Sequence, residues 1–592
     1  MLRVRDSISR HSTVLDGVWN FKVDWDNNGL ENNWAAAPLV DPITMPVPAS
    51  YNDITVDTKI HDHVGYVFYE RTAFAPLYGD DRLILHFGSV THEGVVFVNG
   101  TEVARHTGGY LPFEADITDY VNPGEEFRLT VAVDNRLSWQ TIPPGLVTKD
   151  DSGNDKQIYW HDFYNYAGIH RSVTLYTRPA VHVSDVTITT GIDGADGTVT
   201  YDVVAEGAAS VKVRVLDASG QEVAAAEGAH GEVRVENADF WAPGHGAMYG
   251  LEITADGDVY VQPFGIRTVE VSKGQFLING KPFYFRGYGR HEDNNTVGKG
   301  HSDALMIHDY EIMKWQGANS FRTSHYPYAE EEMDYADEQG FVVIDETPAV
   351  GINMGIGGGI AGAQGYTTFS PDTVNDATRE VHAQVIRDLI ARDKNHPSVV
   401  IWSIANEPES DTDASYDYFK PLAAVAREAD PTRPISYTNV MMAPADKDKI
   451  AELFDVVMLN RYFGWYLDTG NLQDAEKHLR EELDKWVKRL PDHPIIFTEY
   501  GPDTMEGNSD FFRRPWSEEF QIDNIGMFHR VFDDYANVVG EQMWNFADFQ
   551  TTPGIMRVGG NKKGMFTRDR KPKPNAYVVR DRWLAMKEKL GF

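Results

Sequence analysis

The stretch Ser398-Val-Val-Ile-Trp-Ser-Ile-Ala-Asn-Glu-Pro408 decides the fold that this sequence predicts. From Val399 to Ala405 its residues are mostly apolar or β-branched, with no alternation of apolar and polar positions. That pattern is typical of a parallel-sheet strand buried on both faces. Because Pro408 ends the strand, Asn406 and Glu407 are predicted to lie at its carboxyl end. In barrels of alternating strands and helices, reactive side chains lie at this end.

Seven further buried runs complete a set of eight strand candidates. They are residues 283–289, 318–324, 341–346, 435–440, 456–461, 494–499 and 538–545. Amphipathic stretches separate them, and one of these runs from Asp372 to Asp393. There, apolar residues recur at helical spacing at Val374, Ala377, Val381, Val385 and Leu389. Eight alternations of strand and helix predict a (β/α)8 TIM barrel at residues 272–592.

A Gly-rich segment, residues 351–362, follows the third predicted strand and is expected to border the barrel mouth. It has no Lys, Ser or Thr where a phosphate-binding loop needs one. We therefore expect a mobile loop that shapes the choice of ligand, together with the segment after it.

The chain before the barrel reads as two β domains. Residues 1–180 carry short strands broken by turn residues, such as the hairpin dipeptide Asn99-Gly100, and predict an all-β sandwich. Its last part, Gln157 to Arg171, is aromatic and is expected to be a loop. Residues 181–271 contain closely spaced strands that fit a seven-strand immunoglobulin-like sandwich.

The composition excludes several classes of partner. The 592 residues include 54 Lys plus Arg against 89 Asp plus Glu, a formal net charge of −35. Nucleic acids and anionic membranes require basic patches, so neither is an expected partner. The chain has no cysteine, its first residues lack the apolar core of a signal peptide, and no run is long enough for a membrane span. We expect a cytoplasmic protein.

A second predicted strand also ends on a carboxylate. Pro494-Ile-Ile-Phe-Thr-Glu-Tyr-Gly501 places Glu499 at the same barrel mouth as Glu407. Glycoside hydrolysis requires such a pair, one protonated to release the leaving oxygen and one ionised to attack the anomeric carbon. The alternative is that each glutamate only forms an ion pair with a neighbouring arginine. Two on one barrel, one within Asn-Glu-Pro, favour catalysis.

The motifs Trp402-Ser-Ile-Ala-Asn-Glu-Pro408 and Phe497-Thr-Glu-Tyr-Gly501 resemble the acid/base and nucleophile motifs of family 2 glycoside hydrolases. The resemblance extends over essentially the whole chain. It implies a multidomain fold of a jelly-roll β-sandwich, an immunoglobulin-like β-sandwich and a (β/α)8 barrel, and a retaining mechanism. It also implies that Glu407 is the general acid/base, that Glu499 is the nucleophile and that Asn406 binds the sugar 2-hydroxyl. For the retaining geometry the two carboxyl groups are expected ~5 Å apart.

A basic stretch from Arg557 to Lys573 follows the last predicted strand. On a chain with a net charge of −35, such a cluster of cations indicates a specific role. An ammonium and an amide two residues apart in an extended loop, Lys563 and Asn561, can both point at one anion. Their motif, Asn-Lys-Lys-Gly, resembles that of family members that act on β-D-glucuronides, where it binds the C6 carboxylate. Arg557 is expected to assist. For four outer residues, a solvated loop or an oligomer contact is equally acceptable: Arg568, Arg570, Lys571 and Lys573.

Other residues are placed in the pocket by their strand ends or by the resemblance. Arg322 is expected to keep Glu499 ionised, His325 to reach the sugar, and Trp544 to stack on its ring. The resemblance puts Tyr462 beside the nucleophile. It adds three contacts to the sugar: Asn460, Tyr466 and, from the first domain, Asp162. For the aromatic residues, simple packing at the barrel rim remains an alternative.

The predicted reaction needs no metal or cofactor, and the His291-Glu292-Asp293 run lacks a second group of ligands at suitable spacing. The expected partners are small glucuronide conjugates and other copies of the chain, as a homo-oligomer such as a tetramer. Two alternatives stay open. One is another family 2 specificity, a β-galacturonidase, β-galactosidase or β-mannosidase. The other is a carbohydrate-binding protein that has lost catalysis.

Overall fold

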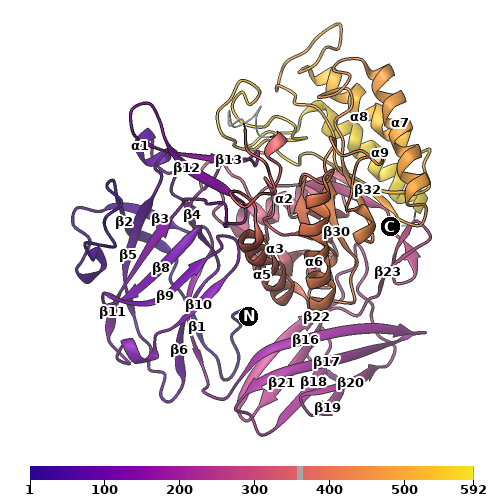
Figure 1. The fold of residues 1–592 in the computed structure, drawn as a ribbon. Helices are drawn as coiled ribbons and strands as arrows, with labels where there is room; N and C mark the ends of the chain where they lie inside the picture. Colours follow the sequence, from indigo (N-terminus) through magenta and orange to yellow (C-terminus); the bar gives the residue numbers. More distant parts are fainter. Residues whose placement is uncertain (357–364, 591–592) are drawn as a thin grey trace.

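The computed structural model describes residues 1–356 and 365–590, so residues 357–362 of the Gly-rich segment lie outside the described part of the chain. Two β-sheet regions flank a region of alternating strands and helices (Figure 1). In this view the indigo and purple N-terminal sandwich lies beside the barrel, and the magenta sandwich lies below it (Figure 1).

The expected barrel is present as a closed ring of eight parallel strands. They are β26 (Phe285–Gly289), β27 (Ser320–Arg322), β28 (Val342–Glu346), β29 (Val399–Asn406), β30 (Ile435–Asn439), β31 (Val457–Asn460), β32 (Ile495–Glu499) and β33 (Val538–Met543). All residues of β29 are buried, as its lack of alternation predicts. The main helices are α2 (Asp303–Gln316), α3 (Glu330–Gln339), α5 (Asp376–Asp393), α6 (Asp413–Ala429), α7 (Leu472–Arg489), α8 (Glu518–Phe532) and α9 (Pro574–Leu590).

Helix α5 confirms the predicted helix but corrects its buried face. Of the five apolar positions expected to face inward, Val374 precedes the helix, and Ala377 and Val381 are exposed. Leu389 is buried as expected, and the other buried positions include Thr378, His382, Ala383, Ile386 and Ile390. The buried face includes the polar residue His382, because one of its ring nitrogens lies within hydrogen-bond distance, 2.7 Å, of the carbonyl oxygen of Ile404.

The N-terminal region is the expected β-sandwich. A six-stranded sheet has the order β3 (Ile43–Val47), β2 (Gly17–Val23), β5 (Tyr66–Phe74), β11 (Glu126–Asp134), β8 (Glu93–Val98) and β9 (Thr101–Thr107). It packs on a four-stranded sheet of β1 (Ser12–Val14), β15 (Val173–Arg178), β6 (Arg82–Phe87) and β10 (Phe113–Asp116). Shorter elements are β4 (Ala49–Ser50), α1 (Thr58–His61), β7 (Val90–Thr91), β12 (Gly145–Lys149), β13 (Asp155–Tyr159) and β14 (Gly168–Ile169). Residues 157–159, expected in a loop, belong to β13; the segment that carries Asp162 is a loop.

The second sandwich has the expected seven strands. One sheet pairs β16 (His182–Asp193), β17 (Asp196–Glu206) and β20 (His230–Val235). The other pairs β19 (Glu222–Glu227), β18 (Val211–Leu216), β21 (Tyr249–Ala255) and β22 (Asp258–Phe264). Valines and aromatic residues on the inner faces form one core.

A three-stranded sheet links this sandwich to the barrel and sets which barrel end is open. It consists of β23 (Val269–Ser272), β24 (Gln275–Ile278) and β25 (Lys281–Pro282). Phe276 and Ile278 of β24 pack with Val342, Val400 and Val539 near the amino ends of the barrel strands. The carboxyl ends, with the predicted site, therefore face the opposite way.

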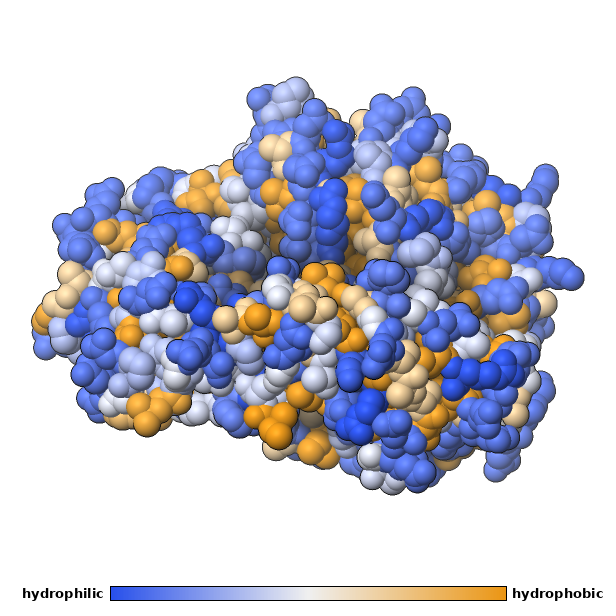
Figure 2. Space-filling model, turned by 90° about the horizontal axis from the view of Figure 1, so that it is seen from below, coloured by the Kyte–Doolittle hydropathy of each residue, from blue (hydrophilic) through white to orange (hydrophobic). Residues whose placement is uncertain are grey.

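The surface agrees with the composition. Figure 2 shows a face on which hydrophilic residues predominate and apolar residues lie in small groups. Among the residues that the structure describes, no helix combines the length and apolar character that crossing a membrane would need.

Candidate active site

The backbone turns sharply where β29 delivers Glu407. Glu407 has a φ of 49°, in the left-handed region that a side chain with a Cβ rarely adopts. Its N–H donates to the carbonyl of Thr438 at 2.8 Å, and its carbonyl accepts from Asn353 Nδ2 at 3.4 Å. These bonds and Pro408 hold the carboxylate at the barrel mouth.

The surroundings of Glu407 favour its protonated form. Burial, and then the charge of nearby Glu499, raises the pKa of Glu407 to about 8. Asn460 Nδ2 donates to its Oε1 at 3.1 Å and partly offsets that effect. A carboxyl group with this pKa holds its proton at neutral pH and can release it to a substrate oxygen.

Glu499, at the end of β32, is held in the opposite way, by donors to both oxygens. Arg322 Nη2 donates to Oε1 at 2.6 Å, and the Tyr462 hydroxyl donates to Oε2 at 2.5 Å. The side chain of Arg322 is fully buried, so its charge acts on Glu499 with little screening by water. The expected contact between Arg322 and Glu499 is thus present. The two glutamates differ as an acid and a nucleophile must.

A third carboxylate, Glu346 at the end of β28, escaped the sequence reasoning. Arg322 Nη1 donates to its Oε1 at 2.7 Å and to its Oε2 at 2.8 Å, so one guanidinium bridges Glu346 and Glu499. Burial would raise the pKa of Glu346, but the charge of Arg322 and the contact with His325 lower it overall. The signal was available, because Glu346 ends a buried apolar strand just as Glu407 and Glu499 do.

The remaining residues expected near the glutamates join the same group. Asn406 Oδ1 lies 3.3 Å from Asn460 Nδ2 and 3.4 Å from Arg322 Nη1. His325 Nδ1 lies 3.0 Å from Glu346 Oε1, and the His325 ring stacks on Trp544 with centroids 5.0 Å apart. Trp544 therefore forms part of the wall beside His325.

A second group of predicted residues surrounds Lys563, which is 1% exposed. Lys563 Nζ donates to the Tyr466 hydroxyl at 2.9 Å and forms an ion pair with Asp503, a residue that the sequence reasoning missed. Burial would raise the pKa of Asp503, but the charges of Lys563 and Arg557 lower it overall. Asp503 comes four residues after Glu499, in the loop that leaves β32.

Asp162 reaches this second group from the N-terminal sandwich. Arg557 Nη2 lies 2.6 Å from Asp162 Oδ2, and Asn561 Nδ2 donates to the same oxygen at 3.1 Å. Arg557 Nη2 also donates to the Tyr466 hydroxyl at 3.0 Å. Arg557 and Asn561, two of the donors expected to hold a ligand carboxylate, thus both bind the carboxylate of Asp162.

One aromatic ring separates the two groups. Lys563 Nζ lies 5.5 Å from the ring centroid of Tyr462, whose hydroxyl donates to Glu499. All the predicted site residues therefore meet at one barrel mouth. The arrangement places two buried glutamates on one side of the Tyr462 ring and Lys563, with its neighbours Arg557 and Asn561, on the other.

Family models match the three regions of the fold. The model described as "Glycosyl hydrolases family 2, TIM barrel domain" matches residues 269–588. The family 2 sugar binding domain matches residues 13–179, and a further family 2 model matches residues 181–267. The chain belongs to family 2 of the glycosyl hydrolases. It is accordingly a glycoside hydrolase, with the multidomain fold that the sequence predicts.

Similar family 2 proteins cover the whole length. A β-glucuronidase of Paenibacillus borealis is 46% identical, with 99% of each chain covered. The human β-glucuronidase is 40% identical, with 98% of this chain and 92% of the human chain covered. A solved structure of Ruminococcus gnavus β-glucuronidase in complex with uronic isofagomine has a TM-score of 0.95 at 40% identity, with 98% of each chain covered.

The outer residues of the basic stretch are not a solvated loop in this family 2 enzyme, apart from Lys571, which is exposed. Arg568 pairs with Asp293 at 2.5 Å and Arg570 with Asp309 at 2.9 Å. Lys573, 1% exposed, donates to Asp548 and also to the carbonyl of Lys562 at 2.8 Å. The alternative of a solvated loop does not hold for Arg568, Arg570 and Lys573, because buried carboxylates, distant in sequence, neutralise these cations.

One group of side chains in the described residues has the proximity of a metal site. Ligand atoms of Asp334, Asp337 and His396 lie within 4.8 Å of one another. Burial would lower the pKa of His396, but the charge of Asp337 raises it to about 9. An imidazolium cannot bind a metal, and Asp334 is already paired with Arg3 and Arg5. The group reads as an ion-pair network.

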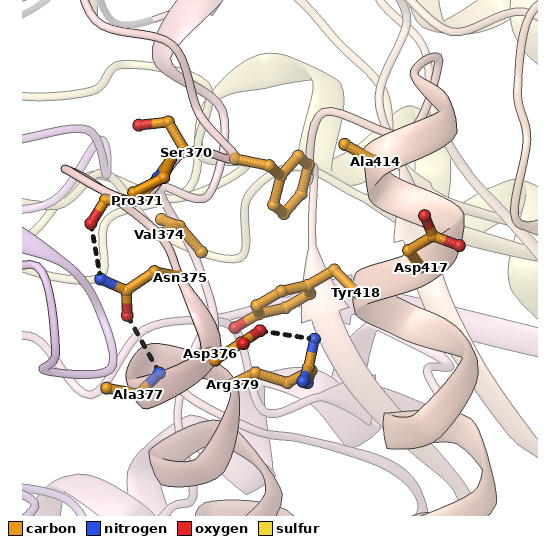
Figure 3. A pocket seen from close by; sticks show the side chains of 11 residues that line it. Ser370, Pro371, Val374, Asn375, Asp376, Ala377, Arg379, Ala414, Asp417 and Tyr418 are labelled. Carbon is orange, nitrogen blue, oxygen red and sulfur yellow. Dashed lines mark hydrogen bonds and ion pairs between the residues drawn. The ribbon is translucent and has the colours of Figure 1, made fainter.

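A hollow of about 590 Å³ lies at the starts of α5 and α6 (Figure 3). Figure 3 shows Tyr418 beside the ion pair of Asp376 and Arg379, and Asn375 capping α5. None of the catalytic candidates lines it. Its lining does include Phe369, Ser370, Pro371, Val374 and Asn375, within the segment after the Gly-rich loop that is expected to shape the choice of ligand.

Proposed function

We propose that this enzyme is a retaining β-D-glucuronidase that releases glucuronic acid and an aglycone. One observation carries the proposal: two unlike glutamates lie across a tyrosine ring from Arg557, Asn561 and Lys563. Relatives named β-glucuronidase, matched over nearly the whole chain, support it. A glycosidase for neutral sugars has no reason to place two buried cations there.

In the first step, Glu499 attacks the anomeric carbon. The bond between that carbon and the aglycone oxygen breaks, and the proton of Glu407 passes to that oxygen. Arg322 and Tyr462 hold the Glu499 oxygens in place for the attack by donating a hydrogen bond to each of them. The product is a glucuronyl ester of Glu499.

In the second step, Glu407 takes a proton from water as that water attacks the anomeric carbon. The ester bond to Glu499 breaks, and the proton taken from water returns Glu407 to its acid form. Two inversions give net retention. Asn406, beside Asn460 and Arg322, is placed to bind the 2-hydroxyl in both steps.

The glucuronate carboxylate would bind between Arg557, Asn561 and Lys563. In the free enzyme Asp162 accepts bonds from Arg557 and Asn561, and Asp503 pairs with Lys563. The incoming carboxylate therefore competes with Asp162 for donors of the right geometry. Asp162 is the more exposed of the two aspartates, with 27% of its side chain accessible against 1% for Asp503.

The stereochemistry is tested by proton NMR during hydrolysis of a p-nitrophenyl β-D-glucuronide. Retention requires the β anomer of glucuronic acid to appear first and to mutarotate later. Initial release of the α anomer would contradict the double displacement and remove Glu499 as nucleophile.

The substrate class is tested with a panel of p-nitrophenyl glycosides. We expect the glucuronide to be preferred over the galactoside and mannoside, because only a uronide supplies an anion for Lys563 and Arg557. A galacturonide carries the same carboxylate, so preference for it would retain the carboxylate site and change the named substrate.

Two further proposals concern the oligomeric state and the cellular compartment of the enzyme. We propose a cytoplasmic homo-oligomer, in keeping with the absence of cysteine from the sequence and with exposed apolar side chains such as Phe511 and Phe512. Light scattering gives the subunit number, and cell fractionation gives the compartment. A monomeric mass or an extracellular location would contradict the respective proposal.

A further inference from the structure

A small cavity lies where the immunoglobulin-like domain meets the barrel. It measures about 180 Å³. Its polar lining comes from Arg267, Lys394, Asn395 and Arg433, with several threonines. Lys394 and Asn395 precede β29, and Arg433 precedes β30, so the cavity lies at the amino ends of the barrel strands. It is therefore at the opposite end of the barrel from Glu407 and Glu499.

Two guanidinium groups meet at this cavity. Arg267, 7% exposed, donates from Nε to the carbonyl of Pro397 at 3.1 Å and from Nη2 to that of Val399 at 2.8 Å. Arg433 Nε donates to the same Val399 oxygen at 2.8 Å. Like charges that share one neutral acceptor repel each other, and burial strengthens the repulsion.

One of these cations has no carboxylate in direct contact, although the charges of Asp430 and Asp337 partly offset its burial. Arg433 pairs with Asp430 at 2.7 Å, and Lys394 pairs with Asp185 at 2.6 Å. Within residues 1–356 and 365–590, no carboxylate forms an ion pair with Arg267, and its Nη1 has no hydrogen-bond acceptor. Burial, with the charge of Arg433, lowers the pKa of Arg267 to about 9. A buried charge without a partner is costly.

We propose that this cavity binds a small oxyanion, phosphate or sulfate, with Arg267 and Lys394 as its cationic ligands. A guanidinium matches the oxygen geometry of such an anion, and a lysine adds a point charge. Ile188, Phe264, Val269 and Pro397 form apolar walls that reduce screening of the charges. The hydroxyls of Thr189 and Thr268 also line the cavity.

The consequence of binding is a tighter junction between two domains. Arg267 belongs to the connection that leaves the immunoglobulin-like domain, whereas Lys394 belongs to the barrel. The backbones already approach closely here, because a Cβ on Gly265 would lie 2.7 Å from Trp241 Cβ and 2.9 Å from Pro397 Cβ. An anion between the two cations would offset the repulsion at this junction and stabilise the folded protein without altering catalysis.

The test titrates inorganic phosphate into the full-length enzyme by calorimetry and thermal denaturation, with sodium chloride holding the ionic strength constant. We expect saturable binding with a rise in Tm, and a similar response to sulfate. Lys394→Gln should raise the phosphate Kd at least about tenfold, since one charge-assisted contact is lost. Arg267→Gln should abolish the response; should that variant fail to fold, the Lys394→Gln result decides.

Lys563→Ala is the matched control, because it removes a cation from the other end of the barrel. Its phosphate response should equal that of the wild type, and loss of the response would assign the binding to the catalytic mouth instead. Absence of saturable binding to the wild type would overturn the proposal. So would an unchanged Kd in both cavity variants. Activity on a glucuronide should change less than about twofold in Lys394→Gln.

Discussion

Two groups of side chains share one barrel mouth but are built differently. We call them the glutamate group (Glu346, Glu407 and Glu499) and the proposed carboxylate-binding group (Arg557, Asn561 and Lys563). Glu346, Glu407 and Glu499 stand on or directly after barrel strands, around one buried arginine. Arg557, Asn561 and Lys563 stand on a loop, and they are held by Asp162 from another domain and by Asp503. In the proposed mechanism, proton transfer and attack use the strand-borne glutamates, whereas substrate choice uses the loop, where one anion can replace another.

The largest effect should follow Glu499→Gln. The amide has the shape of the carboxylate and its oxygen can still accept from Arg322, but it cannot form the ester, so kcat should fall by at least about 10⁴-fold. Steady-state kinetics on p-nitrophenyl glucuronide measure the change, and circular dichroism checks the fold. A fall below tenfold would move the nucleophile to another residue.

Glu407→Gln should lose about 10²- to 10⁴-fold on substrates with a poor leaving group. With a p-nitrophenyl substrate the rate of the first step should fall much less, because p-nitrophenolate leaves without taking up a proton. Comparing kcat/KM for a methyl and a p-nitrophenyl glucuronide separates the two cases. Equal losses on both substrates would mean that Glu407 does not act as the acid.

The pH profile tests the same residue without mutation. The raised pKa of Glu407, about 8, means that its acid form is present below that pH and is lost above it. The kcat/KM for a poor leaving group should therefore decline as pH rises through about 8. Glu407→Gln should remove this alkaline limb. A limb that persists in the variant would belong to another group.

Lys563→Ala tests the carboxylate-binding group. Loss of a charged contact of about 1.5–3 kcal/mol should lower kcat/KM for a glucuronide by about 10- to 100-fold. Activity on a neutral glycoside should change little or rise. Equal effects on both substrates would contradict a role in carboxylate binding. Arg557→Gln, at the residue that pairs with Asp162, is a second test of the same group.

The last effect in this set is on stability rather than on turnover, and should come from the support of the loop that carries Arg557, Asn561 and Lys563. Lys573→Met removes the ammonium that binds Asp548 and the Lys562 carbonyl, and should destabilise the fold by about 3 kcal/mol. Lys571→Ala, on an exposed side chain two residues away, is the matched control and should change stability by less than about 0.5 kcal/mol. Urea unfolding measures both, and similar values would mean that Lys573 adds no more than its exposed neighbour.

The sequence predicted the strand-borne half of the site well. A buried strand that ends on a carboxylate fixes where Glu407 and Glu499 lie, because the sheet forces the ends of its strands together. Glu346 was missed although it has the same local signal. The distant partners could not be read from spacing: Asp503 with Lys563, or Asp309 with Arg570, meet only through tertiary packing. Helix α5 shows the same limit, since the contacts of His382 set which face is buried.

Asp162 ties the specificity of the barrel to a separate domain. Because it reaches Arg557 and Asn561 from the N-terminal sandwich, these two donors have their carboxylate partner only while that sandwich is docked. A barrel without the first 180 residues would keep both glutamates. Arg557 and Asn561 would lose Asp162 as the acceptor of their hydrogen bonds.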